Sequence, residues 1–272
     1  MKPDHRFALI LFLPMAIFVT AFFLVPMAEL AVRSLTARDG GFTYLQILET
    51  PRYLWSLAAT LAVSALTTLA TLVVSTTVGL FLTRNRFAGR EVLIAMLTFP
   101  LAFPGVVVGF MVILLAGRQG LIGEVSKALT GDKIVFAYSM AGLFVGYLYF
   151  SIPRVLLTVM AAAEKLDPAL EEAARSLGAR PAQVLRDVIL PALTPAFIAS
   201  GAICFATAMG AFGTAFTLAT NIDVLPMVIY TEFTLNANIA MAAALSIVLG
   251  LITWAALAFA RTLGGTSVAA AG

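Results

Sequence analysis

The chain has 272 residues, of which 61% are hydrophobic and 11% charged, and its mean hydropathy is +1.00. This composition excludes an ordinary soluble domain and predicts a membrane protein, because so few polar residues could not cover a water-exposed surface. The net charge of +3 is carried by scattered residues without a basic aromatic patch, which argues against nucleic-acid binding.

Six apolar runs approach or exceed the roughly 20 residues that a helix needs to cross a bilayer. We therefore predict an all-α membrane protein with six transmembrane helices in a single domain. In chain order, the predicted spans cover residues 7–28, 54–83, 92–116, 135–163, 192–219 and 239–260. We expect the first run to be an uncleaved span, since it is longer than a usual signal-peptide core and no convincing cleavage site follows it.

The turn between the second and third runs carries three arginines, Arg84, Arg86 and Arg90. By the positive-inside rule this turn is cytoplasmic, and with both termini inside, most lysines and arginines fall on the inner face. The same topology places the charged segment 164–191 in the cytoplasm. Pro100 and Pro104 predict either a kink or a break in the third span.

The segment 164–191 has the local signals of two short helices. Asp167 can cap a helix that begins at Pro168, where a missing N–H costs nothing. Gly178 suits a left-handed helix end, Pro181 can begin a second helix, and we expect Pro191 to end it. Apolar residues recur at helical spacing on the first helix, namely Leu166, Leu170, Ala173 or Ala174 and Leu177. On the second helix one apolar stripe is formed by Val184, Leu185, Val188 and Ile189.

Within this segment Glu172-Ala173-Ala174 is followed by Gly178, Val188 and Leu190-Pro191. This spacing resembles the EAA motif of ABC importer permeases, in which isoleucine is usual at the position of Val188. The resemblance implies the type I importer permease fold, with a cytoplasmic coupling-helix loop that docks into a separate ATPase subunit. The residues it implies in ATPase coupling are Glu171, Glu172, Ala173, Ala174, Gly178, Val188, Leu190 and Pro191. A surface loop resting on lipid headgroups is the alternative for such a segment.

The resemblance covers about residues 63–260 and is strongest to the spermidine/putrescine-type branch, which is related to permeases for sulfate, molybdate, ferric iron and aminoethylphosphonate. The residues that carry this ranking are 117–122, 166–168 and 225–230. The resemblance implies a polyamine or an aminoethylphosphonate-like organic solute, delivered by a periplasmic binding protein. It also implies a second permease subunit, identical or related, in the bacterial inner membrane.

No motif for chemistry is found in the chain. GxxxxGK[ST], HExxH and GxSxG are absent, and a single cysteine and a single histidine exclude the usual zinc sites. We therefore expect a non-catalytic subunit without cofactor or metal, whose partner ATPase binds ATP and magnesium. The alternative function is an ATP-independent carrier or channel, but the inverted repeats and paired membrane charges expected of a carrier are not evident.

The translocation path has one charged candidate, Arg154 in the fourth run. Its guanidinium either faces the path, where it would favour an anion, or reaches the inner headgroups. A polyamine path would instead need acidic residues, and those near span ends are Glu29, Asp223 and Glu232. The candidates in the fifth span are Met209, Phe212, Thr214 and Thr217, for which helix packing is the alternative role.

Overall fold

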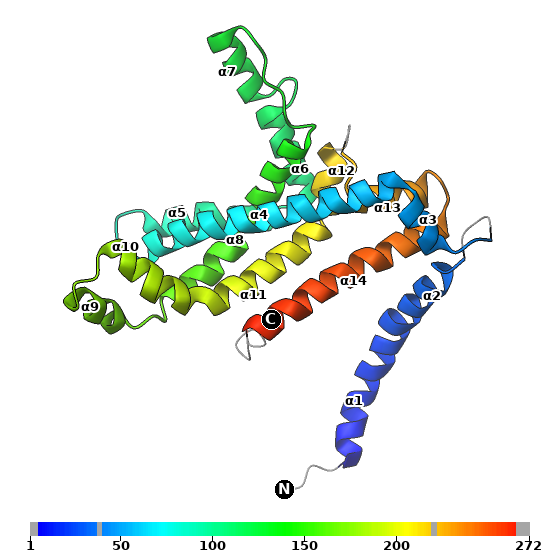
Figure 1. The fold of residues 1–272 in the computed structure, drawn as a ribbon, viewed down its shortest axis with the longest axis horizontal. Coiled ribbons are helices and arrows are strands. Elements are labelled where there is room, and N and C mark those ends of the chain that lie inside the picture. Colours follow the sequence, from blue (N-terminus) through cyan, green and yellow to red (C-terminus); the bar gives the residue numbers. More distant parts are fainter. Residues whose placement is uncertain (1–4, 37–39, 219–221, 265–272) are drawn as a thin grey trace. The chain divides into compact units, whose positions relative to one another are not determined.

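The computed structural model describes residues 5–36, 40–218 and 222–264. The regular elements in these residues are helices, and six helical stretches are long and apolar enough to cross a membrane (Figure 1). The predicted all-α class with six transmembrane helices is therefore confirmed. The six stretches are Phe12–Arg33, Pro51–Arg84, Gly105–Thr130, Met140–Ala163, Pro181–Met209 and Ile239–Leu263.

The chain divides into two compact units, which we describe separately. The first comprises residues 1–55 and 228–250, and the second comprises residues 56–227 and 251–272. Helices α4 (Pro51–Arg84), α13 (Leu225–Thr234) and α14 (Ile239–Gly264) each have residues in both units.

The first span lies in the first unit and consists of α1 (His5–Val19), the π-helical η1 (Thr20–Leu24) and α2 (Val25–Arg33). It extends to Arg33, whereas the sequence predicted an end at residue 28. In the added turns Arg33 Nε donates to Glu29 Oε1 one turn earlier, at 2.6 Å, an exposed pair that favours the helix by a few tenths of a kcal/mol. A polar pair of this kind supports a helix beyond the hydrophobic segment that identified it.

A buried carboxylate joins two further helices of the first unit. Glu232 of α13 is 4% exposed, and its Oε1 accepts hydrogen bonds from Tyr53 Oη and Asn236 Nδ2, each at 3.1 Å. Helix α3 (Thr43–Glu49) precedes α4 in this unit, and Tyr44 Oη lies 2.8 Å from Ser34 Oγ. Because Glu232 has two donors, its burial serves the local packing of this unit.

The centre of the second unit is formed by α4, α8 (Met140–Ala163) and α11 (Leu190–Met209), which run alongside one another (Figure 1). Their contacts use small residues: a Cβ at Gly79 would lie 3.3 Å from Val159 Cγ1, and one at Gly201 would lie 3.2 Å from Leu72 Cδ1. Cys204 packs in the same region and is buried. Small residues at these positions let the membrane helices approach closely.

The third predicted span, 92–116, is broken in the structure. Helix α5 (Arg90–Thr98) is followed by a 3₁₀ turn, η2 (Phe99–Ala102), and α6 (Gly105–Ala116) begins after extended residues at Phe103 and Pro104. Proline removes a backbone donor and disfavours a helical residue before it, so two prolines four residues apart end one helix and start another. The long apolar stretch instead continues from α6 to α7 (Leu121–Thr130).

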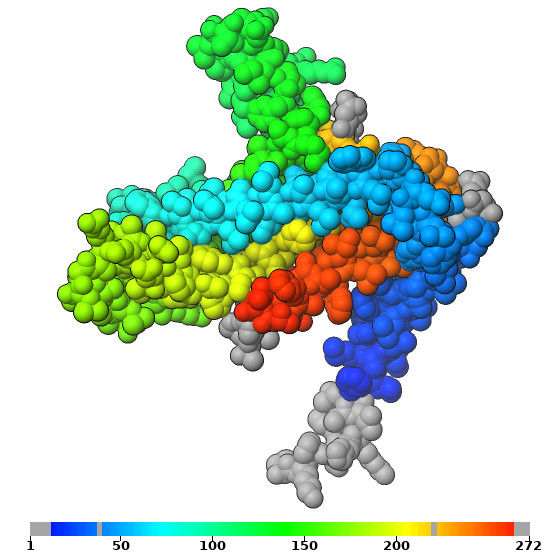
Figure 2. Space-filling view, in the orientation of Figure 1, coloured from blue at the N-terminus to red at the C-terminus, as the bar shows by residue number. Residues whose placement is uncertain are grey.

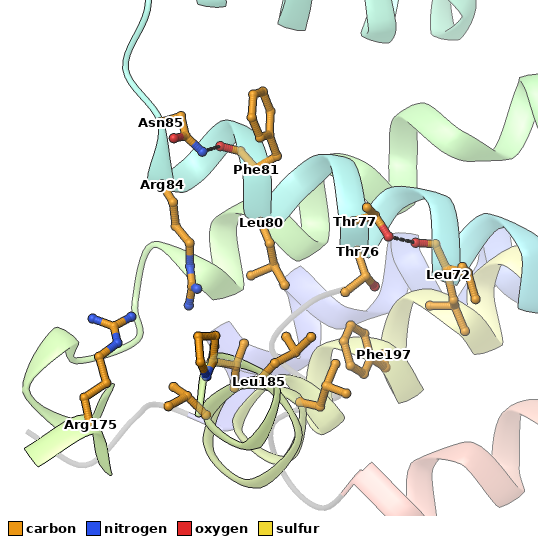
Figure 3. A pocket seen from close by; sticks show the side chains of 15 residues that line it. Leu72, Thr76, Thr77, Leu80, Phe81, Arg84, Asn85, Arg175, Leu185 and Phe197 are labelled. Carbon is orange, nitrogen blue, oxygen red and sulfur yellow. Dashed lines mark hydrogen bonds between the residues drawn. The ribbon is translucent and has the colours of Figure 1, made fainter. Parts of the chain in front are cut away.

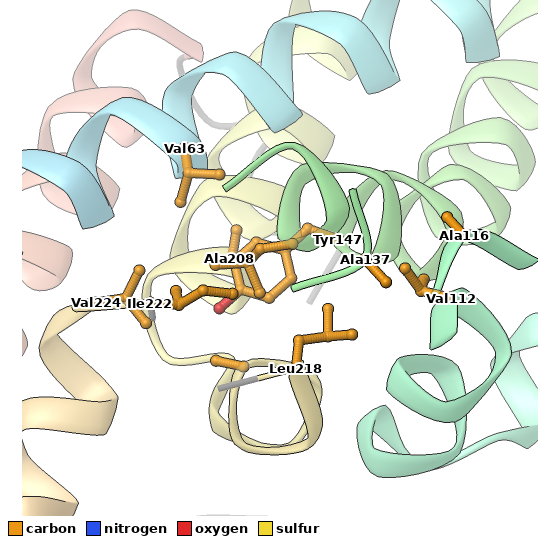
Figure 4. Close-up of a cluster of buried hydrophobic side chains, with 11 residues drawn as sticks. Val63, Val112, Ala116, Ala137, Tyr147, Ala208, Leu218, Ile222 and Val224 are labelled. Atoms are coloured by element: carbon orange, nitrogen blue, oxygen red, sulfur yellow. The ribbon is translucent and has the colours of Figure 1, made fainter. Parts of the chain in front are cut away.

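The fifth predicted span, 192–219, also differs. Helix α11 ends at Met209, and a separate short helix, α12 (Phe212–Leu218), packs against α6 and α8; residue 219 lies outside the described residues. Tyr147 Oη of α8 donates to Ala211 O at 2.6 Å between the two helices. Around this break lies a buried apolar cluster that includes Val112, Tyr147, Ala208 and Leu218 (Figure 4).

Candidate functional site

Helix α9 (Pro168–Ser176) begins as its sequence predicts. The Ala169 N–H donates to Asp167 Oδ1 at 2.9 Å, and Pro168 occupies the first helical position. An aspartate at this place satisfies one of the free N–H groups of the first turn and also offsets the positive end of the helix dipole. The start of the helix is therefore determined locally.

The end of α9 is a Schellman motif centred on Gly178, whose φ is +87°. The Ala179 N–H donates to Ala174 O at 3.1 Å, and the Gly178 N–H donates to Arg175 O at 2.9 Å. A Cβ at Gly178 would meet nothing within 4 Å. The left-handed backbone, and not lack of space, is therefore what favours glycine here.

The second helix does not end at Pro191, so this prediction is wrong. Helix α10 (Pro181–Val184) continues through the π turn η3 (Leu185–Ile189) into α11, giving one helical stretch of 29 residues, Pro181–Met209. The Leu190 N–H bonds to Leu185 O in the five-residue pattern of a π turn. This wider turn directly precedes Pro191 and accommodates a residue that lacks a backbone donor.

One side of the helix pair packs against the rest of the second unit. Val184, Ile189 and Leu193 are buried together, and Ala174, Val188 and other partly buried apolar residues pack around them. Leu190 is half-buried and Pro191 is exposed. Ala174 of the EAA motif is thus an internal contact between α9 and α10.

Glu171 also faces the protein, and its side chain is 15% exposed. One of its oxygens accepts a hydrogen bond from Arg84 Nη2 at the end of α4, and the other accepts one from Arg175 Nη2 at 3.1 Å. Charge-assisted bonds of this kind are stronger than neutral ones. Arg84 therefore joins α9 to the adjoining end of α4, whereas the Arg175 bond lies within α9.

Four other residues in and directly after α9 are exposed, and two of them are leucines. Leu177 is 90% exposed, Leu170 is 55% exposed, and Glu172 and Ala173 are exposed between them. We call these four residues the α9 surface. The helix pair forms one end of the described second unit, and Figure 2 shows it in yellow-green. Leucines this exposed on a charged helix are typical of a protein-binding surface.

The apolar residues that recur at helical spacing on and around α9 differ in burial. Leu166 and Ala174 pack against the apolar cluster, whereas Leu170 is 55% and Leu177 90% exposed. Periodicity identified the helix but did not identify which of its apolar residues are covered. The two leucines, together with Arg84 and Arg175, are candidate residues that the sequence interpretation did not assign to this site.

The residues predicted to line the translocation path differ in their surroundings. Arg154 is exposed on α8, with its guanidinium carbon 5.9 Å from the centre of the Phe150 ring. Met209, at the end of α11, is fully buried, and Phe212 is half-buried with its ring 5.2 Å from that of Phe216. The structure therefore brings Arg154 into contact with an aromatic ring and places Met209 in the protein core.

Thr214 and Thr217 of α12 make packing contacts. Thr214 Oγ1 donates to Gly105 O at 2.9 Å, and Thr217 Oγ1 donates to Gly213 O at 3.0 Å. A Cβ at Gly109 of α6 would lie only 2.6 Å from Thr217 Cβ. These contacts favour the packing role that the sequence left open, and they join the helix break before α6 to the break before α12.

Within the part of the chain that the structure describes, no group of three or more His, Cys, Asp or Glu side chains could hold a metal ion. The candidate site combines Glu171 and Ala174, which contact the rest of the protein, with the exposed residues of the α9 surface.

Comparison with known proteins gives a family match over most of the chain. The model of the binding-protein-dependent transport system inner membrane component matches residues 75–265. PhnU of Salmonella typhimurium, assigned to 2-aminoethylphosphonate transport, is 29% identical over 263 residues, which cover 93% of this chain and 92% of PhnU. The sulfate transport system permease CysT of the same organism is 32% identical over 206 residues, or 76% of this chain and 73% of CysT.

Solved structures show the same fold. A chain of the bacterial transporter that imports the polysaccharide alginate aligns with a TM-score of 0.78 and 18% identity, over 95% of both chains. A chain of the MetNI methionine transporter aligns with a TM-score of 0.59 and 18% identity, over 78% of this chain and 94% of that one. The chain is a multi-pass membrane protein that belongs to the family of binding-protein-dependent transport system inner membrane components, the permease subunits of ABC importers.

Proposed function

We propose that the α9 surface is where this permease subunit docks onto a separate ATPase subunit. The observation that carries the proposal is the exposure of Leu177 and Leu170 on either side of Glu172 and Ala173. Burying two leucines against a partner gains roughly 1.5–3 kcal/mol for each side chain, and Glu172 offers a charge to a basic partner residue.

The long helical stretch after α9 connects the α9 surface to the membrane part of the protein, so that a movement of α9 would be transmitted there. The stretch Pro181–Met209 has 29 residues and is therefore about 44 Å long. It begins beside the α9 surface and ends at the break before α12. A force applied to α9 would act on this helix through the Ala174 contacts and the Schellman turn, and would act on α4 through Glu171.

For the solute, we propose a small molecule with a phosphonate or similar oxyanion group. Two relatives are named for 2-aminoethylphosphonate and sulfate, and Arg154 provides an exposed cation on a membrane helix. The polyamine alternative has less support, because Glu232 is buried with two donors and Glu29 is paired with Arg33.

The proposal also implies the membrane in which the subunit lies and the proteins that it contacts. The subunit would lie in a bacterial inner membrane with both termini cytoplasmic, and it would pair with a second permease subunit. A periplasmic binding protein would deliver the solute, and the ATPase subunits would bind ATP and magnesium. The basic turn that contains Arg84, Arg86 and Arg90 supports this orientation.

We expect Arg154→Gln to raise the KM for uptake of 2-aminoethylphosphonate about tenfold, because a charge-assisted hydrogen bond contributes roughly 1.5–3 kcal/mol. Radiolabelled uptake would be measured in cells that also contain the ATPase and the binding protein. Arg261→Gln removes the same charge from the end of α14 and serves as the control. Unchanged uptake by the Arg154 variant, or competition by spermidine alone, would rule out the oxyanion proposal.

A further inference from the structure

A groove lies in the second unit between α4 and the helical stretch Pro181–Met209 (Figure 3). Its volume is about 660 Å³, which is within the range of small-molecule sites. The walls are mostly apolar, with Leu72, Leu80 and Phe81 on α4 facing Leu185 and Phe197 on the other side. Both walls belong to candidate membrane spans, so the groove runs along the apolar part of the protein.

One end of the groove is cationic. Arg84 and Arg175 line the end beside α9, whereas Leu72 and Phe197 lie at the far end (Figure 3). Both guanidinium groups donate to the single carboxylate of Glu171, which leaves one net positive charge in this cluster. Each guanidinium carries several N–H donors and uses one of them in these bonds, so donors remain for an anion in the groove.

We propose that this groove binds one anionic phospholipid. The acyl chains would lie between α4 and the Pro181–Met209 stretch, and the phosphate would receive hydrogen bonds from Arg84 and Arg175. The groove and a phospholipid match in charge and in position. The apolar walls correspond to the acyl chains, and the arginines at the end of the span correspond to the anionic headgroup. Guanidinium binds phosphate through paired N–H groups, and basic sites between membrane helices bind anionic headgroups.

The site has a consequence for α9. Arg84 and Arg175 are the residues that hold Glu171, so the bound phosphate would join the cluster that fixes α9 to the end of α4. An anionic lipid would thus stabilise the position of α9, and of the α9 surface, relative to α4. The lipid site itself depends neither on the solute nor on an ATPase, since all its residues belong to this chain.

The test is lipid retention by the full chain in detergent, measured by native mass spectrometry during titration with phosphatidylglycerol. Arg84→Gln removes one of the two guanidinium groups and with it the net positive charge of the cluster, and Leu185→Trp fills the groove from an exposed position without changing charge. Arg86→Gln is the matched control, because Arg86 is exposed in the same turn and does not line the groove. We expect the wild type and the control to bind about tenfold more tightly than the other two variants.

Three results would overturn the proposal. Equal retention of phosphatidylglycerol by all four proteins would place the lipid elsewhere, and equal retention of phosphatidylcholine would mean general solvation by lipid. Binding of glycerol phosphate with the same affinity would make this a site for phosphate alone. Circular dichroism melts in phosphatidylcholine would verify that each variant is folded, so that weak retention reports on the site. Loss of ATPase binding has no bearing on any of these outcomes.

Discussion

Replacement of Gly178 by proline is expected to abolish solute uptake while the protein remains in the membrane. Gly178 has a φ of +87°, which proline, fixed near −65°, cannot adopt, and proline also lacks the N–H that bonds to Arg175 O. The turn between α9 and α10 would therefore change direction, and the α9 surface would move relative to α11. We expect uptake to fall at least tenfold, with unchanged amounts of protein in the membrane fraction.

The matched control is Gly178→Asn. Asparagine tolerates a left-handed backbone better than other side chains do, and its Cβ would meet nothing within 4 Å. This variant should retain most of the uptake. If the proline variant transported normally, or if asparagine were as harmful as proline, the geometry of the turn would not be what transport requires.

The double variant Glu172→Arg, Leu177→Asp is expected to lose its ATPase subunit during purification in detergent. The first change reverses the charge of the α9 surface, and the second places a carboxylate where a leucine would be buried in the complex. Because both side chains are exposed, neither change disturbs the fold of the permease. Co-purification of the two subunits, compared with the wild type, measures the effect.

The control for this pair is Leu129→Asp on α7. Leu129 is 79% exposed on α7, a short helix of the second unit that is separate from α9. Its substitution should leave ATPase binding unchanged. Full retention of the ATPase by the double variant would contradict docking at the α9 surface.

The local features of α9 could be predicted from sequence because neighbouring residues determine them. Asp167, Pro168 and Gly178 occupy the cap, the first position and the left-handed end that their chemistry favours. The prediction that Pro191 ends the second helix was wrong because a π turn, η3, directly precedes this proline and lets the helix continue. No residue in the local sequence indicates that turn.

Long-range contacts could not be predicted. Glu171 and Arg84 are 87 residues apart, and only the packing of α9 beside α4 brings them together. For the same reason the sequence grouped Glu171 and Ala174 with Glu172 and Ala173, although the first two face the protein and the last two face outward. Helical spacing gives the faces of a helix, but the identity of the covered face depends on the rest of the fold.

The central claim, that the α9 surface contacts the ATPase, is tested most directly by site-specific cross-linking. The chain has a single cysteine, Cys204, and it is buried, so a cysteine introduced at Leu177 would be the accessible thiol. With a photoactivatable thiol reagent in membranes that contain the whole transporter, Leu177→Cys should form an adduct with the ATPase subunit and Leu129→Cys should not. An adduct from Leu129→Cys but none from Leu177→Cys, or equal adducts from both, would contradict the account.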